Sequence, residues 1–302
     1  MTQATTETPP AATQAPSPTT RIPPATIKRR PARRLLKIVS AAAPGLQPAA
    51  QRLLIRFGYA VVNRWMDQAQ AECMNYGYAA LDEHADAGAS GGEAYCHQLY
   101  AHVAGATALA GKETLEVGCG RGGGAAYVAE RFGVARLTGL DFSEKAITFA
   151  RDQHTDPRLR FVRGDAEDLP FADGSFDVVL NVESSHCYPN VPRFIAEAFR
   201  VLRPGGHFVF ADLRLQNEVD GLRQSFLDGG FRILEEESIT PNVVRSLELD
   251  SPRRVAFVRQ SVPRPLRPYV LDFAGASGTD VYKALRAGDL EYLRFALVKP
   301  AA

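Results

Sequence analysis

The sequence predicts an α/β protein with a mostly parallel, doubly wound sheet. Stretches typical of strands alternate with stretches typical of helices between residues 114 and 212, and repeated β-α-β units of this kind form parallel sheets. The first strand runs directly into a glycine-rich turn that reads Glu116-Val-Gly-Cys-Gly-Arg-Gly-Gly-Gly124. A glycine-rich turn between a strand and a helix is typical of the cofactor loop in sheets of this class.

Each expected element has its own signal. Val178, Val179 and Leu180 form a continuous apolar run, as in a strand buried on both faces. Ser143 stands at a helix N-cap position, and Pro204-Gly-Gly206 closes a later helix. We expect strands at 115–117, 135–140, 159–162, 176–181 and 207–211, with helices that begin near 123 and span 143–153 and 190–202.

The glycine-rich turn predicts the type of cofactor. Gly118, Gly120 and Gly122 let the backbone turn sharply, and the first N–H groups of the following helix would face a ligand. The spacing also fits G-x-G-x-x-G, so the turn alone admits a dinucleotide-binding enzyme. Glu116 favours another cofactor, because a carboxylate at the rim of the loop repels a pyrophosphate but accepts hydrogen bonds from an ammonium group. The sequence therefore predicts S-adenosylmethionine.

Polar residues stand at the ends of the expected strands. Asp141 follows the glycines by about 20 residues, the spacing at which a carboxylate takes ribose hydroxyls. Asp165 would reach an adenine amino group, while Asn181 and Asp212 end the next two strands. Ligands bind at the carboxyl ends of such strands, so the joint placement of these residues indicates one site.

Composition limits the other classes of function. The chain has 302 residues, 45% hydrophobic and 23% charged, which suits one large or two small globular domains. A net charge of +1 gives no reason to expect a nucleic-acid partner. The four cysteines are far apart, with no C-x-x-C pair, so we expect no metal site and a reducing, cytoplasmic location.

The N-terminal third has a different character. Residues 1–40 combine a disordered Thr, Pro and Ala tail with a basic segment at 28–37, which is a linker or contacts an anionic membrane surface. We expect neither a secretory signal nor a membrane span. Residues 41–110 form an N-terminal helical lid, with an amphipathic helix at 47–71 and a second helix at 93–109.

Five motifs in this order resemble those of class I S-adenosylmethionine-dependent methyltransferases. They cover 114–212 and read Glu116-Val-Gly-Cys-Gly-Arg-Gly122, Gly139-Leu-Asp141, Gly164-Asp-Ala-Glu-Asp-Leu-Pro-Phe171, Phe176-Asp-Val-Val and Val201-Leu-Arg-Pro-Gly-Gly206. Within the family, the stretches 181–189 and 276–292 most resemble mycobacterial phthiotriol and phenolphthiotriol dimycocerosate methyltransferases and related polyketide or fatty-acid O-methyltransferases.

The resemblance implies a Rossmann-like sheet of seven strands. It adds a helix at 217–227, a strand at 231–237 and an antiparallel last strand at 292–298. Residues 111–240 would form the cofactor-binding core, 241–288 a helical cap over an apolar substrate, and 289–302 the last strand and C-terminus.

The resemblance also implies the cofactor contacts. Glu116, Gly118 and Gly120 would contact the methionine end, and Asp141 the ribose. Tyr76, with Asn75, resembles the aromatic gate that such enzymes place over the sulfonium. The remaining expected contacts are Phe142 and Ala166 on the adenine faces, Asp165 on its amino group, and Gly122 and Asn181.

His186 is the candidate general base, because an acceptor hydroxyl must lose its proton as the new bond forms. It follows Asn181 by five residues and is expected at the mouth of the cleft, where Asp212 would orient its ring or hold the substrate hydroxyl. The simpler interpretation makes His186 a hydrogen-bonded turn residue before Pro189.

The sequence thus predicts an O-methyltransferase acting on a hydroxyl of a hydrophobic lipid or polyketide-type molecule. A C-methyltransferase of the quinone or sterol kind, a cyclase with a methyltransferase fold, and a non-catalytic cofactor-binding protein remain alternatives. A homodimer and peripheral contact of the cytoplasmic protein with a membrane are left open.

Overall fold

The computed structural model describes residues 72–82 and 93–301. These residues belong to the second of two compact units, Gln47–Ala302, whereas the unit Met1–Leu46 falls outside them. The predictions for the tail, the basic segment and the amphipathic helix at 47–71 therefore lie outside the described residues.

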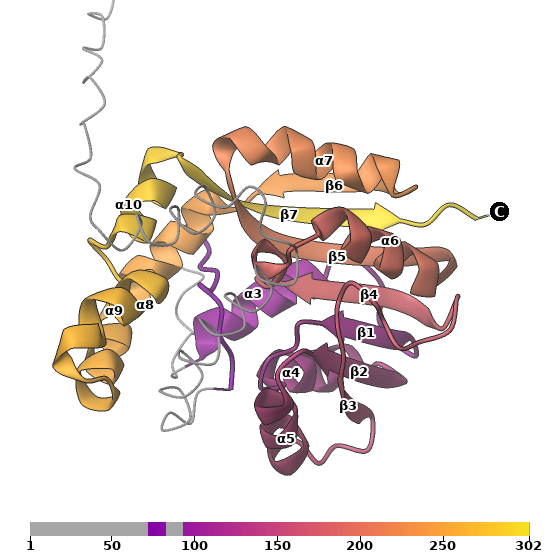
Figure 1. The fold of residues 1–302 in the computed structure, drawn as a ribbon, viewed down its shortest axis with the longest axis horizontal. Coiled ribbons are helices and arrows are strands. Elements are labelled where there is room, and N and C mark those ends of the chain that lie inside the picture. The colour runs from indigo at the N-terminus through magenta and orange to yellow at the C-terminus, as the bar shows by residue number, and fades with distance from the viewer. Residues whose placement is uncertain (1–71, 83–92, 302) are drawn as a thin grey trace, which may run out of the picture. The chain divides into compact units, whose positions relative to one another are not determined.

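Seven strands form one sheet in this part of the chain. They are β1 (Glu113–Val117), β2 (Arg136–Asp141), β3 (Leu159–Arg163), β4 (Phe176–Val182), β5 (Leu202–Leu215), β6 (Arg232–Ser238) and β7 (Leu290–Val298). Their order across the sheet is β3-β2-β1-β4-β5-β7-β6 (Figure 1). The first five strands pair in parallel, and β7 is antiparallel to both neighbours. The predicted doubly wound sheet is confirmed, and its strand order reverses between β1 and β4.

Helices cover both faces of the sheet (Figure 1). They are α3 (Ala94–Ala104), α4 (Gly123–Phe132), α5 (Glu144–Gln153), α6 (Val191–Val201), α7 (Val219–Asp228), α8 (Thr240–Ser261), α9 (Arg267–Phe273) and α10 (Asp280–Ala287). One buried cluster joins α3, α4, α5, α8 and α10 to the sheet, and a second joins α6 and α7 to it. Val178 and Leu180 belong to the first cluster and Val179 to the second, because β4 is buried on both sides.

Local signals place most element boundaries within a few residues of the expected ones. The Ser143 hydroxyl accepts a hydrogen bond from the N–H of Ala146, and Asn190 caps α6 in the same way. Strand β5 is longer than expected, because Leu202 pairs with Phe176 across a bulge and the strand continues along β7 to Leu215. Asp212 therefore lies within β5, one residue beyond its pairing with β4.

The segment between β6 and β7 is helical, as expected for 241–288. It contains α8, α9 and α10, which gather at the edge of the sheet toward which the parallel strands point (Figure 1). Val243 and Leu247 of α8 are buried against the core, whereas α9 has no buried residue. No helix of the described ranges is long and apolar enough to cross a membrane.

Gly124 provides a test of how α4 packs on α3. A Cβ atom at this helical glycine would overlap the ring of Tyr100, whereas Gly221, on the exposed side of α7, has open space around it. We expect Gly124→Ala to lower the free energy of unfolding by about 1–3 kcal/mol through overpacking. The control Gly221→Ala should raise it by about 0.5–1 kcal/mol, since alanine restricts the unfolded chain. Urea unfolding measures both, and equal effects would contradict the proposed packing.

Candidate active site

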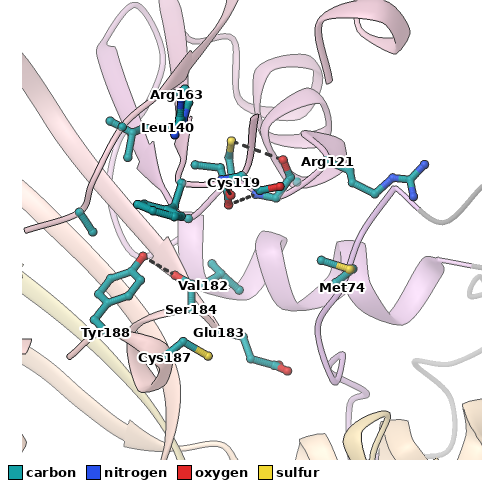
Figure 2. Close-up of a pocket in the computed structure, with 18 of the residues that line it drawn as sticks. Met74, Cys119, Arg121, Leu140, Arg163, Val182, Glu183, Ser184, Cys187 and Tyr188 are labelled. Carbon is teal, nitrogen blue, oxygen red and sulfur yellow. Dashed lines mark hydrogen bonds between the residues drawn. The ribbon is translucent and has the colours of Figure 1, made fainter. Parts of the chain in front are cut away.

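A cavity of about 530 Å³ lies at the carboxyl ends of β1 to β4 (Figure 2). The volume is that of an ordinary small-molecule site. Its walls come from segments that are far apart in the sequence: 72–74, 118–121, 140–145, 163–167, 182–184 and 187–189. The strand order reverses at this point, so the cavity occupies the position at which sheets of this class bind ligands.

The glycine loop forms one wall through its backbone. The N–H groups of Gly118 and Cys119 donate to the Leu140 carbonyl at 2.7 and 3.0 Å, which fastens the loop to β2. Gly120, at φ +54°, faces open space apart from Met74, so a ligand can approach its backbone closely. Gly122 lies elsewhere than predicted: it packs on Phe161 and is not among the described residues that line the cavity.

Asp141 lies at the end of β2 and lines the cavity. Its two carboxylate oxygens accept hydrogen bonds from the N–H groups of Gly120 (2.9 Å) and Ser143 (2.8 Å). Burial nevertheless raises the pKa of Asp141, although these N–H groups act in the opposite direction. The expected adenine contacts also line the cavity, and they are Phe142, Asp165 and Ala166.

Glu116 lies beneath the glycine loop instead of at its rim. The side chain is fully buried, and the Tyr100 hydroxyl donates to its Oε1 at 2.7 Å. Its Oε2 is buried without a partner among the described residues, and burial raises the pKa of Glu116 to about 7. A buried carboxylate oxygen without a donor is costly, so this position suits a ligand that brings one.

Asn181 and Tyr76 lie outside the described lining of the cavity and form hydrogen bonds that connect neighbouring segments of the protein. The Asn181 amide donates to the Val117 carbonyl at 2.8 Å and to the Ser184 hydroxyl at 2.7 Å. The Tyr76 hydroxyl donates to the Phe273 carbonyl at 3.0 Å, toward α9. Both were predicted to contact the cofactor directly. Here the Asn181 amide N–H groups and the Tyr76 hydroxyl bind the protein, whereas the Asn181 Oδ1 is buried without a partner among the described residues.

Asp212 is fully buried and holds the turn that follows β4. Its Oδ2 accepts from the Ser185 hydroxyl (2.6 Å) and the His186 N–H (2.8 Å), while its Oδ1 accepts from the Leu213 N–H (2.8 Å). The Arg214 guanidinium lies 3.2 Å away. Burial alone would raise the pKa of Asp212, but the cationic neighbours hold it well below its usual range.

His186 does not lie where the sequence analysis expected it. Its ring lines a second cavity of about 330 Å³, with Leu213 and Arg214, and it is absent from the described lining of the main cavity. Its Nδ1 is 2.7 Å from the Asp212 carboxylate. Burial opposes a charge on the ring, yet Asp212 raises the pKa of His186 well above its usual range. Because the His186 ring lies away from the main cavity and its Nδ1 is paired with Asp212, the geometry counts against His186 as the general base.

Glu183 is the residue that the sequence analysis missed. It follows β4 directly and lines the main cavity with Ser184, Cys187 and Tyr188. Its φ of +48° makes it the non-glycine residue with a positive φ in the described part of the chain. A carboxylate just beyond a strand end was the available signal, but its orientation depends on this backbone turn.

Three side chains near the cavity have the composition of a metal site. Ligand atoms of Cys73, Glu93 and His97 lie within 4.8 Å of one another. However, Glu93 already accepts hydrogen bonds from the N–H groups of Glu72 and Cys73, and burial raises the pKa of the Cys73 thiol well above its usual range. Glu93 thus holds the backbone of Glu72 and Cys73 in place.

Comparisons with known proteins agree with this architecture. Residues 115–210 match the model of the methyltransferase domain family. A phthiotriol/phenolphthiotriol dimycocerosates methyltransferase of Mycobacterium tuberculosis is 38% identical over 247 residues, which cover 81% of this chain and 91% of the relative. A fatty-acid O-methyltransferase of Mycolicibacterium smegmatis is 38% identical over 257 residues, or 83% of this chain and 90% of the relative.

Solved structures share the fold. The cyclase SpnF superposes with a TM-score of 0.67 at 23% identity, covering 83% of this chain and 97% of the other. A geranyl diphosphate C-methyltransferase of Streptomyces coelicolor gives a TM-score of 0.58 at 17% identity, covering 80% of this chain and 97% of the other. Similarity at this level concerns the fold alone.

The predicted family, enzyme class and cofactor are therefore confirmed. The sheet order, the glycine loop at the strand reversal and the extensive similarity to the mycobacterial enzymes lead to one assignment. The cofactor is S-adenosylmethionine, and the chain belongs to the class I S-adenosylmethionine-dependent methyltransferases, in the group of the phthiotriol/phenolphthiotriol dimycocerosates and fatty-acid O-methyltransferases.

Proposed function

We propose that the protein methylates a hydroxyl oxygen of a hydrophobic, lipid or polyketide-type molecule. The observation that carries this proposal is a single cavity that contains both the glycine loop and residues without an expected cofactor role. We assign one half, with the glycine loop, Asp141 and Ala166, to the cofactor and the other half, with Met74 and Glu183, to the acceptor. The names of the similar enzymes, which refer to phthiotriol compounds and fatty acids, support a lipid-type acceptor.

The first half of the cavity suits S-adenosylmethionine. We assign the backbone of Gly118 and Gly120, which line the cavity, to the methionine end. Glu116 does not line the described cavity, but its unpartnered Oε2 lies beneath this loop and suits an ammonium group bound above it. Asp141 would bind the ribose hydroxyls. Phe142, Ala166 and Asp165 would surround the adenine, as Asp165 keeps one carboxylate oxygen outside its hydrogen bond with Glu167.

The cofactor supplies a methyl group on a sulfonium, which is already strongly electrophilic. The chain must therefore bind the acceptor in line with that methyl group and exclude competing water, and this alignment contributes most of the rate acceleration. The hydroxyl proton also needs a destination as the new bond forms.

We propose that the insertion 241–288 selects the acceptor, within the division into core, cap and last strand set out above. The insertion is tied to the segment beside Met74. The Ser246 hydroxyl donates to the Tyr76 carbonyl at 3.0 Å, and the Arg254 guanidinium donates to the carbonyls of Asn75 and Tyr76 at 3.2 and 3.3 Å. A change in the insertion would thus reach the acceptor half through residues 74–76.

Product analysis tests the function. The purified protein with S-adenosylmethionine and long-chain alcohols or diols should release S-adenosylhomocysteine, and mass spectrometry should find a methyl ether. A new carbon–carbon bond would identify a C-methyltransferase. Acceptor turnover without S-adenosylhomocysteine would identify a cyclase. Cofactor binding with no turnover of any acceptor class would favour a non-catalytic protein.

The assignment of Asp141 leads to a second prediction. Asp141→Ala should weaken S-adenosylhomocysteine binding by about 1.5–3 kcal/mol, the scale for losing hydrogen bonds to a charged group. Asp168→Ala is the matched control, because Asp168 is exposed and does not line the cavity. Calorimetric titration measures both affinities, and circular dichroism checks the fold. Unchanged affinity in Asp141→Ala would refute the assignment.

We infer in addition that the basic segment 28–37 contacts anionic membrane, where a lipid acceptor resides. The full chain should sediment with vesicles that contain anionic phospholipid. A variant that lacks residues 1–37 should not. Turnover of a soluble short-chain acceptor should be the same for both chains. Equal sedimentation of the two chains would exclude this role. Light scattering of the protein without vesicles tests for a homodimer.

A further inference from the structure

The backbone of Glu183 has a conformation that few residues adopt. At φ +48° it lies in the left-handed region, which is unfavourable for a residue other than glycine. Its N–H still donates to the Ala211 carbonyl at 2.7 Å, which extends the pairing of β4 with β5 by one residue. The chain turns immediately afterwards, so the surrounding hydrogen bonds hold the unusual conformation in place.

The side chain of Glu183 is held by one oxygen and open at the other. Its Oε2 accepts hydrogen bonds from the Tyr76 N–H at 2.7 Å and the Tyr292 hydroxyl at 2.8 Å. Its Oε1 has no protein partner in the part of the chain that the structure describes. Glu183 lines the cavity, and in Figure 2 its side chain extends toward the lower right of the view, on the side away from Cys119. Two donors thus orient the group while one oxygen remains available.

The position of Glu183 in the sheet places it beside the cofactor loop. Strand β4 pairs with β1, with Leu180 opposite Glu116. Glu183 is three residues beyond Leu180, and Cys119 is three residues beyond Glu116. Glu183 and Cys119 both line the main cavity. In Figure 2, Cys119 lies above the open space and Glu183 below it.

Opposing effects act on the pKa of the Glu183 carboxyl. Burial raises the pKa of Glu183 to about 7, and the charge of Asp212 also raises it. The Tyr76 N–H, the Tyr292 hydroxyl and the charge of His186 lower it. A carboxyl with a pKa near neutrality can accept a proton during the reaction and release it to water afterwards.

From this geometry we propose that Glu183, and not His186, takes the proton from the acceptor hydroxyl. The inference rests on the proposed O-methylation. As the acceptor oxygen forms its bond to the methyl carbon, the carbon–sulfur bond breaks and its electron pair stays on sulfur, which becomes a neutral sulfide. The hydroxyl proton passes to Oε1 of Glu183, which becomes a carboxylic acid. The positive charge of the sulfonium and the negative charge of the carboxylate disappear together.

This assignment distinguishes two classes of acceptor. An alcohol has to lose a proton in the reaction and so needs Glu183. A fatty acid is already ionised at neutral pH, so its carboxylate can be methylated without a base. The dependence on Glu183 should therefore be large for an alcohol and small for a carboxylate.

Glu183→Gln tests the assignment with little change in shape. The amide oxygen can still accept from Tyr76 and Tyr292, but the amide cannot accept a proton. With 1-hexadecanol as the probe, turnover should fall by about 10²–10⁴-fold, the scale of a general base. With hexadecanoic acid, any turnover should stay within about tenfold of wild type. An equal loss with both probes, or an alcohol rate near wild type, would overturn the proposal.

The pH profile gives a second readout. Turnover of the alcohol should rise as pH passes through about 7, where the Glu183 carboxyl ionises, and Glu183→Gln should lack this step. Tyr292→Phe removes a donor to the carboxylate and should move the midpoint to higher pH. If His186→Ala abolished turnover and the pH step while Glu183→Gln kept both, the base would be His186.

A binding measurement separates failure of this inference from failure of the proposed function. A carboxylate near the sulfonium favours cationic S-adenosylmethionine over neutral S-adenosylhomocysteine. Glu183→Gln should therefore reduce that preference by about 3- to 30-fold in calorimetry, without any acceptor. Glu291→Gln, on the strand that carries Tyr292, should leave it unchanged, because Glu291 does not line the described cavities. An unchanged preference in Glu183→Gln would place the carboxylate away from the methyl group and refute the inference, even if the wild type methylated neither probe.

Discussion

The buried carboxylate of Asp212 holds together the part of the fold on which the site depends. A charge without exposure is stable only if hydrogen bonds and opposite charges replace its hydration. Here Ser185, His186, Leu213 and Arg214 supply them. These contacts close the turn after β4 against β5, so the wall of the cavity beyond Val182 has a defined shape.

The turn after β4 therefore borders two different cavities. One side presents His186 to the second cavity, and the other presents Glu183 and Cys187 to the main one. The imidazole therefore pairs with Asp212, and Glu183 lines the main cavity.

The main cavity concentrates carboxylates that match the charge of its ligand. Burial raises the pKa of Asp141 and Glu183, which line the cavity, and of Glu116 beneath the glycine loop, so each carboxylate gains from a nearby cation or donor. S-adenosylmethionine carries an ammonium and a sulfonium, whereas a dinucleotide brings negative phosphates. The electrostatics of the cavity thus explain why a loop that fits G-x-G-x-x-G takes this cofactor, and Tyr76 and Arg254 connect the cavity to the helical insertion.

The sequence is sufficient to predict the sheet, the cofactor loop and the positions of Asp141, Asp165 and Ala166 at strand ends. Those features follow from local patterns, since apolar runs, caps and glycines specify where a strand ends and what stands there. The direction of each side chain depends on contacts between distant parts of the chain. Glu116 is buried under the loop, and the Asn181 amide binds the Val117 carbonyl. His186 lines the second cavity, whereas Glu183 lines the main one. Spacing along the chain cannot settle these directions, because they depend on one left-handed residue and on the partners that Asp212 finds across the sheet.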